Sequence, residues 1–252
     1  MKLKIMTYNI QHGHIHLSDP GRIALEEMAE VIRECGADII GLNEVRGRGT
    51  HPEYTAQVER MADCLGFHCW FGRSICVGGQ NPYGNAVLSR WPICEAKVNH
   101  IPDPCEAERG RRFEHRSILR AVIELPEGGY FTVFSSHFGL TPPEQRNAVT
   151  LASALTDAER LPFALMGDFN VTPDDPVLLP LNEKLNTTNA QLEGQLSHPS
   201  HAPVDRIDYI YVSRSAAVLS AEVLPAQASD HRPVVAEIEI PSDPDGKFRY
   251  SE

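Results

Sequence analysis

The stretch from residue 67 to residue 136 constrains the fold most, because it contains several strand-like runs and no convincing helix. The strand-like runs cover residues 67–71, 85–89, 118–124 and 130–136. A doubly wound parallel sheet would alternate strands and helices more regularly than this, and it is the competing architecture. We expect an α+β fold in which two β-sheets pack as a sandwich and helices cover the outside.

Three helices are expected where cap signals flank an amphipathic run. They are the segment from Asp19 and Pro20 to Gly36, the segment 53–65 before Gly66, and the segment from the Thr141–Glu144 capping box to residue 158. A short helix is expected at 173–181 and a loop at 185–204. Further strands are expected at residues 2–10, 37–42, 163–166, 206–212, 217–223 and 234–240.

The chain of 252 residues is expected to form one domain over residues 1–240, followed by a polar tail over 241–252. The net charge of −11 opposes nonspecific binding to nucleic acid, which relies on Lys and Arg. The six cysteines form no CxxC pair and no zinc spacing, residues 1–9 lack the apolar core of a signal peptide, and no apolar run is long enough for a membrane span. These features predict a cytoplasmic protein with reduced thiols.

The strongest chemical signal is Gly167-Asp168-Phe169-Asn170, which follows the apolar run 161–166. Residues two apart in an extended segment face the same side, so Asp168 and Asn170 can reach one ligand. Gly167 allows the backbone to approach closely. The alternative interpretation of this segment is a helix N-cap or an Asx turn.

Asp208 lies inside the apolar run 207–212, where a buried carboxylate is costly unless it is paired. Its partner is either the neighbouring Arg206 or the distant His231. A carboxylate that orients the His231 ring would fix its tautomer and raise its basicity. Asp230, the residue before His231, could then point toward a metal ion.

Three further polar residues, Asn9, Glu44 and His137, end or follow strand-like runs and can face the same place. Each also has an ordinary structural role open to it, as a turn former, a surface carboxylate or a hydrogen-bonded His. Hard oxygen donors suit Mg²⁺, which needs only one or two carboxylates besides the phosphate oxygens of a substrate. With one acid–base group, such a centre can direct water at a phosphate ester.

Seven motifs resemble, in the same order, those of the endonuclease/exonuclease/phosphatase superfamily. The motifs are Thr7-Tyr-Asn-Ile10, Asn43-Glu-Val45, Tyr83-Gly-Asn-Ala-Val-Leu-Ser-Arg90, Ser135-Ser-His137, Gly167-Asp-Phe-Asn170, Arg206-Ile-Asp-Tyr209 and Ser229-Asp-His-Arg-Pro233. The superfamily includes deoxyribonuclease I-like nucleases, abasic-site endonucleases, inositol polyphosphate 5-phosphatases and neutral sphingomyelinases. The resemblance spans nearly the whole chain, and it implies a deoxyribonuclease I-like four-layer sandwich of two β-sheets between helices.

The resemblance also implies which residues hold metal and which position water. Asn9, Glu44 and Asp230 match residues on the metal side of the site. Asp168 and Asn170 match the pair that positions the attacking water and the phosphate. The implied cofactor is Mg²⁺ or Mn²⁺.

Two histidines have counterparts at the reacting phosphate. His231, oriented by Asp208, matches the essential His at the scissile phosphate. His137 matches a second His that some branches of the superfamily use as an acid or a phosphate ligand. The resemblance leaves open whether His231 or Asp168 is the base.

Substrate contacts are expected from Asn85 and from a basic cluster, Arg109-Gly-Arg-Arg112 with Arg116. The cluster is either a solvated loop or a clamp for phosphate, and Arg116 is best placed because it precedes the strand 118–124.

Three features depart from the usual family pattern. After Val45 the chain reads Arg46-Gly-Arg48-Gly, where an acidic residue is frequent in small bacterial-type members. Asn43 stands where Gln is usual, which should leave a ligand role for Glu44 unaffected. The loop His12-Gly-His-Ile-His16 carries three alternating histidines. We expect it to be exposed rather than an accessory metal site, because nothing nearby in the sequence completes a set of soft ligands.

The sequence therefore predicts a divalent-metal-dependent phosphoesterase that hydrolyses phosphodiesters or phosphomonoesters by in-line attack of an activated water. A nuclease acting on DNA or RNA is the alternative, and a non-catalytic binding module on the same scaffold is less expected. The net charge of −11 and the lack of an aromatic-rich basic surface slightly favour a small molecule or lipid head group over nucleic acid. No protein partner is predicted.

Overall fold

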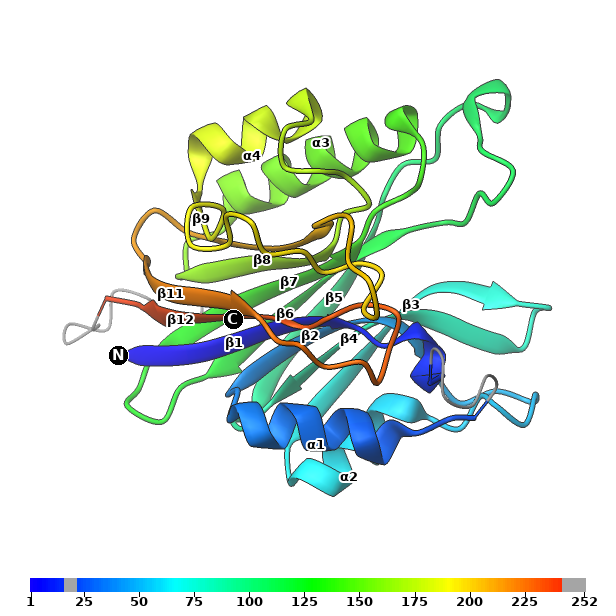
Figure 1. Ribbon diagram of the computed structural model, residues 1–252, viewed down its shortest axis with the longest axis horizontal. Coiled ribbons are helices and arrows are strands. Elements are labelled where there is room, and N and C mark those ends of the chain that lie inside the picture. The colour runs from blue at the N-terminus through cyan, green and yellow to red at the C-terminus, as the bar shows by residue number, and fades with distance from the viewer. Residues whose placement is uncertain (16–21, 242–252) are drawn as a thin grey trace.

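The computed structural model describes residues 1–15 and 22–241, and twelve strands within them form two six-stranded sheets. Figure 1 shows the two sheets stacked face to face, with α1 (Leu25–Cys35) and α2 (Gln57–Leu65) on one side and α3 (Pro142–Ala158) and α4 (Leu179–Lys184) on the other. The expected four-layer sandwich with helices outside is confirmed. The doubly wound parallel sheet is excluded, since both sheets mix parallel and antiparallel neighbours.

The first sheet contains β1 (Lys2–Asn9), β2 (Ile39–Arg46), β3 (His68–Val77), β4 (Asn81–Ser89), β11 (Ala217–Val223) and β12 (Val234–Glu239). Their order is β11-β12-β1-β2-β4-β3. Only β1 and β2 are parallel neighbours, and α1 connects them. The termini of the described chain therefore meet in the middle of this sheet, where β1 pairs with β12.

The second sheet contains β5 (Ile93–His100), β6 (Ser117–Glu124), β7 (Tyr130–His137), β8 (Phe163–Asp168), β9 (Asn186–Thr187) and β10 (Asp208–Val212). Their order is β5-β6-β7-β8-β10-β9. Here β7 and β8 are the parallel pair, and α3 connects them. Each sheet thus has one βαβ unit, whose two parallel strands end at the same edge.

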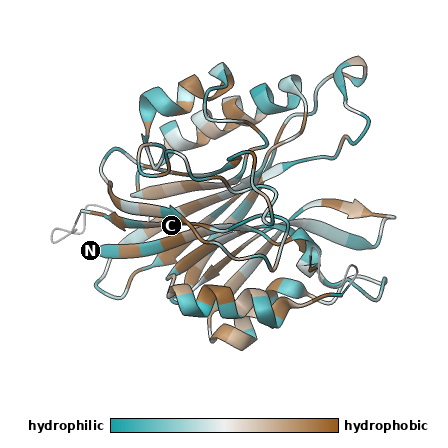
Figure 2. Cartoon of the chain, viewed as in Figure 1, coloured by the Kyte–Doolittle hydropathy of each residue, from teal (hydrophilic) through white to brown (hydrophobic). Residues whose placement is uncertain are grey.

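Three groups of buried hydrophobic residues hold the layers together. One lies between the sheets, one lies between the first sheet and α1 and α2, and one lies between the second sheet and α3. Figure 2 shows the hydrophobic colouring concentrated on the central strands, while the helices carry both hydrophobic and hydrophilic residues. Helix α1 illustrates why, since Leu25, Met28, Ala29 and Ile32 lie on one stripe and are buried.

The helix ends partly follow the sequence signals. Gly36 and Gly66 end α1 and α2 in the left-handed conformation, and Thr141 with Glu144 forms the expected capping box of α3. Asp19 and Pro20 lie outside the described residues. No helix in the described part of the chain is long and apolar enough to cross a membrane.

Both of the first two helices begin later than expected. Helix α1 starts at Leu25, because the preceding residues pair instead: Ile23 forms a bridge with His14, and the Ala24 N–H donates to the Gly13 carbonyl. Helix α2 starts at Gln57, because Thr55 pairs with Arg48 across a turn. Backbone groups committed to a bridge cannot continue a helix.

The main strand-level differences are a missed strand and a longer hairpin. Strand β5 was not expected, and β3 and β4 extend well beyond the runs 67–71 and 85–89. Residues 78–80 between β3 and β4 include Gly78 and Gly79, both with positive φ (58° and 77°). These glycines suit the turn conformation of a hairpin. The region 173–181 contains a 3₁₀ turn (Pro176–Leu178) and the start of α4, and the region 185–204 is loop apart from β9. Of the expected polar tail, only residue 241 lies within the described residues.

Candidate active site

One edge of the sandwich gathers polar side chains from both sheets. In the parallel pair β1–β2, the last paired position places Asn9 opposite Asn43. In the parallel pair β7–β8, the last position places His137 opposite Asp168, and β10 places Asp208 on the other side of Asp168. The two sheets face each other, so the polar ends of their parallel strands meet at one place.

Asp168 is at the centre of this group and is buried. Its Oδ2 accepts a hydrogen bond from Nδ2 of Asn9 at 3.0 Å. The same oxygen lies 3.4 Å from Nε2 of His137 and 3.6 Å from Nε2 of His231. Burial raises the pKa of Asp168 far above its ordinary value, and the charge on His231 offsets this only in part. The site therefore holds a carboxylate that lacks the solvation it would have in water.

Glu44 is connected to this centre through Asn9, whose Nδ2 also donates to Glu44 Oε1 at 3.2 Å. On its other side, Glu44 Oε2 lies 3.4 Å from Nε2 of His12. Both Glu44 and His12 have positive φ, 59° and 57°. Non-glycine residues in this conformation are strained, and such residues cluster at functional sites. The His12 turn is held by the side chain of Gln57, which donates to the His12 carbonyl at 2.5 Å.

His231 and Asp208 form a buried pair. Nδ1 of His231 lies 2.9 Å from Oδ2 of Asp208, and the Ser197 hydroxyl donates to the same oxygen at 2.7 Å. Of the two partners weighed for Asp208, the structure shows His231, and no ion pair with Arg206 exists among the described residues. Burial alone would lower the pKa of His231, but the charges of Asp208 and Asp168 raise it above its ordinary value. Nδ1 thus carries a proton, and Nε2 faces the centre of the site.

The Gly167–Asn170 segment turns sharply at the end of β8. Gly167 has φ of 150°, and a Cβ there would lie 1.7 Å from the Ser136 carbonyl oxygen. This confirms the close backbone approach expected of that glycine. Asn170 has φ of 51°, and its N–H donates to Asp168 Oδ1 at 2.9 Å. This bond closes an Asx turn, which was the alternative interpretation, so Asp168 and Asn170 do not lie on one face of an extended segment as expected. The Asn170 Nδ2 donates to the Phe138 carbonyl at 3.1 Å.

His137 is buried and receives a hydrogen bond from Arg116. Arg116 Nη1 lies 2.8 Å from Nδ1 of His137, and Arg116 also pairs with Glu114 at 3.1 Å. Burial, together with the charge of Arg116, lowers the pKa of His137 well below its ordinary value. An Arg can only donate, so Nδ1 of this neutral ring accepts and Nε2 carries the proton that faces Asp168.

The rest of the basic cluster does not reach the site. Arg109 pairs with Asp103 at 3.4 Å, and Arg111 and Arg112 are exposed. Only Arg116 turns inward, with 11% of its side chain exposed.

Two asparagines bridge the sheets behind the site. Nδ2 of Asn43 donates to Asn85 Oδ1 and to the Ser136 carbonyl, both at 2.9 Å. Oδ1 of Asn43 accepts from the Asp168 N–H at 2.9 Å. Asn85 in turn donates to the Ser117 carbonyl at 2.9 Å. The substrate contact expected of Asn85 stays a prediction, and in the structure its side chain supports Asn43.

Asp230 lies beside two histidines. Ligand atoms of Asp230, His198 and His231 lie within 4.8 Å of one another, and the His198 and His231 rings are 4.6 Å apart. Ser229, the preceding residue, donates to the Asn9 carbonyl at 2.8 Å. This bond ties the Asp230–His231 segment to the end of β1.

The histidine loop is not exposed as expected. The side chains of His12 and His14 are 27% and 26% exposed. His12 reaches Glu44, while His14 lies 3.4 Å from Nη1 of Arg46. His16 lies outside the described residues. The expectation was wrong because three consecutive positive φ angles, 43°, 57° and 78° from Gln11 to Gly13, turn the loop back over β2.

Sequence reasoning missed several residues that complete the site. His12, Ser197 and His198 were assigned to loops, and Asn43 was noted only as a departure from the family pattern. Each lies one to three residues from a position that was identified or within a segment without regular structure. Only the alternating histidines at residues 12–16 gave a usable signal, and they were interpreted as solvent-facing.

The donor set fits a hard divalent cation. Glu44 and Asp168 supply carboxylate oxygens, and Asp168, Asp208 and His231 have ligand atoms within 4.8 Å of one another. Asn9 presents its amide nitrogen to both Glu44 and Asp168. Its oxygen accepts from the Gln11 N–H at 3.0 Å, so coordination of a cation by Asn9 would require the amide to turn and give up this hydrogen bond. Oxygen-rich sets of this kind suit Mg²⁺ and Mn²⁺.

Comparisons with known proteins agree with this geometry. The sequence model of the Endonuclease/Exonuclease/phosphatase family matches residues 6–231. An uncharacterized protein of Escherichia coli K12, YbhP, is 29% identical, and the match covers 94% of this chain and 96% of that protein.

Solved structures share the fold. An endonuclease/exonuclease/phosphatase from Beutenbergia cavernae is 26% identical, with a TM-score of 0.76 over 95% of this chain and 72% of that one. The Bacteroides thetaiotaomicron mannosyl-6-phosphatase Bt3783 is 19% identical, with a TM-score of 0.75 over 94% of this chain and 100% of that one. At 19% identity, the second likeness is evidence of the fold alone.

Proposed function

The chain belongs to the endonuclease/exonuclease/phosphatase family, and from this premise we propose that it is a divalent-metal-dependent phosphoesterase. It hydrolyses phosphomonoesters or phosphodiesters by in-line attack of water on phosphorus. Residues 1–240 form its catalytic domain. The observation that carries the proposal is the position of Asp168 Oδ2, 3.4 Å and 3.6 Å from the Nε2 atoms of two buried histidines and bonded to Asn9.

Asn9, Glu44 and Asp230 are the residues proposed to hold Mg²⁺ or Mn²⁺. A bound divalent cation would neutralise charge on the phosphoryl group and on the leaving oxygen. Glu44 is well suited to this, because its side chain is 21% exposed and so is reachable from solvent while remaining fixed by Asn9. The strained backbone at Glu44 holds that carboxylate at the edge of the site.

Asp168 and Asn170 orient the attacking water, and His231 faces the scissile phosphate. Asp208 accepts the Nδ1–H of His231, which leaves Nε2 as the nitrogen that exchanges a proton or binds a phosphate oxygen. A protonated His231 would stabilise negative charge that develops on the phosphoryl oxygens. The proton of the attacking water goes to Asp168 or, when Nε2 of His231 is unprotonated, to His231.

Two further residues bind the phosphate: Arg116, which precedes β6, and His137, which ends β7. Arg116 is nearly buried and close to the site, so its guanidinium can pair with a phosphate oxygen without displacement of much water. The Nε2–H of this neutral His137 can donate a hydrogen bond to a phosphate oxygen or to the leaving oxygen. Asn85 is proposed as a further substrate contact.

A small phosphate ester or lipid head group is the proposed substrate class. The net charge of −11 and the outward, carboxylate-paired position of Arg109 leave little positive surface for a long nucleic acid. The proposal is compatible with the name of the structurally similar Bt3783, a mannosyl-6-phosphatase of the same fold. A nuclease is the alternative. We also propose a cytoplasmic location, because the six cysteines are all unpaired.

Metal-depleted protein, assayed before and after addition of Mg²⁺ or Mn²⁺, tests the proposal. The substrates are bis-nitrophenyl phosphate, nitrophenyl phosphate, inositol phosphates, abasic DNA and single-stranded DNA. We expect turnover of a small ester that vanishes with chelator and returns with metal. His231→Ala, purified in the same way, controls for a contaminating phosphatase. Equal turnover by this variant, or turnover that survives chelation, would refute the proposal, and preferential cleavage of DNA would support the nuclease instead.

A further inference from the structure

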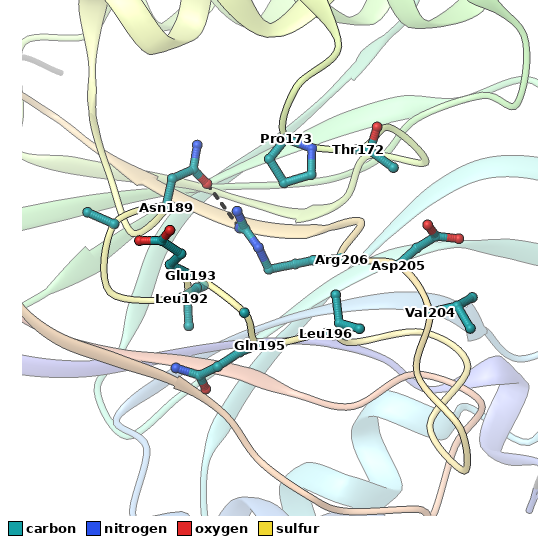
Figure 3. Close-up of a pocket in the computed structure, with 12 residues that line it drawn as sticks. Thr172, Pro173, Asn189, Leu192, Glu193, Gln195, Leu196, Val204, Asp205 and Arg206 are labelled. Atoms are coloured by element: carbon teal, nitrogen blue, oxygen red, sulfur yellow. Dashed lines mark hydrogen bonds between the residues drawn. The ribbon is translucent and has the colours of Figure 1, made fainter.

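A cavity of about 560 Å³ lies outside the catalytic cluster, between the turn at residues 172–173 and the loop at 189–206. Figure 3 shows the Arg206 side chain extending across this cavity toward Asn189. The walls are mixed, with apolar side chains from Pro173, Leu192 and Leu196. None of the residues assigned to the candidate active site lines it.

Arg206 is the only buried cation in the lining. It is 5% exposed, and its guanidinium makes one hydrogen bond in the described part of the chain, from Nη1 to Oδ1 of Asn189 at 2.9 Å. Its carbon Cζ lies 5.2 Å from the centre of the Tyr209 ring. Among the described residues, no carboxylate lies within ion-pair distance of this side chain. An Arg keeps its charge when buried, and its only close partners among the described residues are this amide and this ring. The Asp208 carboxylate acts on it from beyond ion-pair distance.

The two carboxylates that line the cavity do not supply the missing counter-charge. Glu193 and Asp205 are both exposed. Asp205 points away from the guanidinium in Figure 3, although it is the residue next to Arg206. The remaining N–H donors of Arg206 are not sealed inside the protein, and Arg206 lines the cavity. Spare guanidinium donors that open onto a cavity favour an oxyanion.

The mouth of the cavity is apolar. Val204 is 67% exposed and Leu196 is 36% exposed, and both line the cavity. Exposed hydrophobic side chains beside a buried positive charge can bind the apolar part and the anionic part of one ligand. A ligand with both characters would cover Val204 and Leu196 while it neutralises Arg206.

We propose that this cavity binds a small organic anion, whose phosphate or carboxylate group pairs with Arg206 and whose apolar part lies on Leu196 and Val204. This site is separate from the proposed phosphoesterase site and goes beyond that function. Its neighbours in sequence nevertheless belong to the catalytic group, since Leu196 precedes Ser197 and Arg206 lies two residues before Asp208. The Ser197 hydroxyl bonds to Asp208, so a ligand that orders this loop would also hold Asp208 in place.

Calorimetric titration of the metal-depleted full chain tests the site without any turnover. The probes are phenylphosphonate, whose C–P bond a phosphoesterase does not cleave, benzoate, and neutral benzyl alcohol, all at constant ionic strength. We expect saturable binding of at least one anion and none of the alcohol, and the anion that binds identifies the acidic group. Arg206→Gln should weaken this binding about tenfold or more, as expected for loss of a charge-assisted hydrogen bond.

Two further variants keep the test decisive if Arg206→Gln folds poorly. Val204→Asp places a negative charge at the exposed mouth and should weaken binding by about threefold or more, while its unfolding temperature and any esterase activity stay unchanged. His231→Ala should leave the affinity unchanged.

Loss of binding in His231→Ala with retention in Val204→Asp would place the anion at the catalytic group and overturn the proposal. Absence of saturable binding, or equal binding of benzyl alcohol, would overturn it too. Since no hydrolysis is measured, failure here is distinguishable from failure of the phosphoesterase proposal.

Discussion

The Nδ1 atom of His231 lies 2.9 Å from Oδ2 of Asp208, although 23 residues separate them in the chain. This contact fixes which nitrogen of the ring faces Asp168. In Asp208→Asn the neutral amide no longer stabilises a protonated ring, so kcat should fall by ~10²–10⁴, the range for loss of an acid–base group. Steady-state kinetics on the best phosphate ester measure it. Ser197→Ala removes the other partner of the same oxygen and should have a much smaller effect.

Direct replacement of His231 or of Asp168 by Ala should reduce kcat over the same range, ~10²–10⁴, if each belongs to the acid–base pair. Circular dichroism on each variant establishes that the fold is intact. Turnover close to that of the wild type in both variants would remove the proposed mechanism.

Asp168→Asn should stabilise the protein when metal is absent. Burial raises the pKa of Asp168, so ionisation of the carboxyl group costs more in the folded chain than in the unfolded one. We expect this cost to exceed that of the hydrogen bond from Asn9 or Asn170 that the amide NH₂ of Asn cannot accept. Removal of the buried charge should increase the free energy of unfolding by about 1–2 kcal/mol, which corresponds to an increase of roughly 2–8 °C in Tm for a chain of this size. Differential scanning calorimetry on the metal-depleted protein at pH 8 measures this increase.

The pH dependence of that stabilisation has a defined sign. A carboxyl group with a raised folded-state pKa is protonated in both states below about pH 4, so the variant gains nothing there. The wild type loses stability as the pH rises from about 4 through the folded-state pKa. The difference in Tm between Asp168→Asn and the wild type should therefore increase over this pH range. A gap that does not change with pH, or a variant that is less stable at pH 8, would contradict the burial argument.

Arg116→Ala should raise KM for an anionic substrate by about tenfold, since a charge-assisted contact with phosphate is lost. A fall in kcat should accompany it, because the same guanidinium fixes the tautomer of His137. Arg112→Ala is the matched control, an exposed Arg of the same basic cluster. If KM stays equal in the wild type and both variants, Arg116 does not contact the substrate.

Much of the sandwich could be predicted, because strands with a buried face have continuous or alternating apolar runs. The runs at 118–124 and 130–136 became β6 and β7 almost unchanged. Strand β5 was missed because its residues are mostly half-buried or exposed, which leaves no clear apolar period. The start of α1 was misplaced because a bridge formed by Ile23 decides it, and such a bridge depends on tertiary contacts.

The residues of the site also differ in whether the local sequence could identify them. Asp168 and Asp208 were identified because each interrupts or ends an apolar run, where a buried carboxylate is costly unless it is paired or hydrogen-bonded. Asn43 and His198 have no such signal, since their importance comes from neighbours that are distant in sequence. Asn43 contacts Asp168 across 125 residues. His12 was misjudged for another reason, as the left-handed turn that brings it to Glu44 was not evident from its sequence.

Binding of Mn²⁺ to the wild type and to Glu44→Gln, followed by electron paramagnetic resonance, tests the central claim most directly. The claim is that carboxylates from distant segments hold a divalent cation at the sandwich edge. We predict that the wild type binds Mn²⁺ and that Glu44→Gln weakens binding by about tenfold or more, since a charged ligand becomes neutral. Glu59→Gln, at an exposed position of α2, should bind like the wild type. Equal Mn²⁺ affinity in all three proteins would contradict the account.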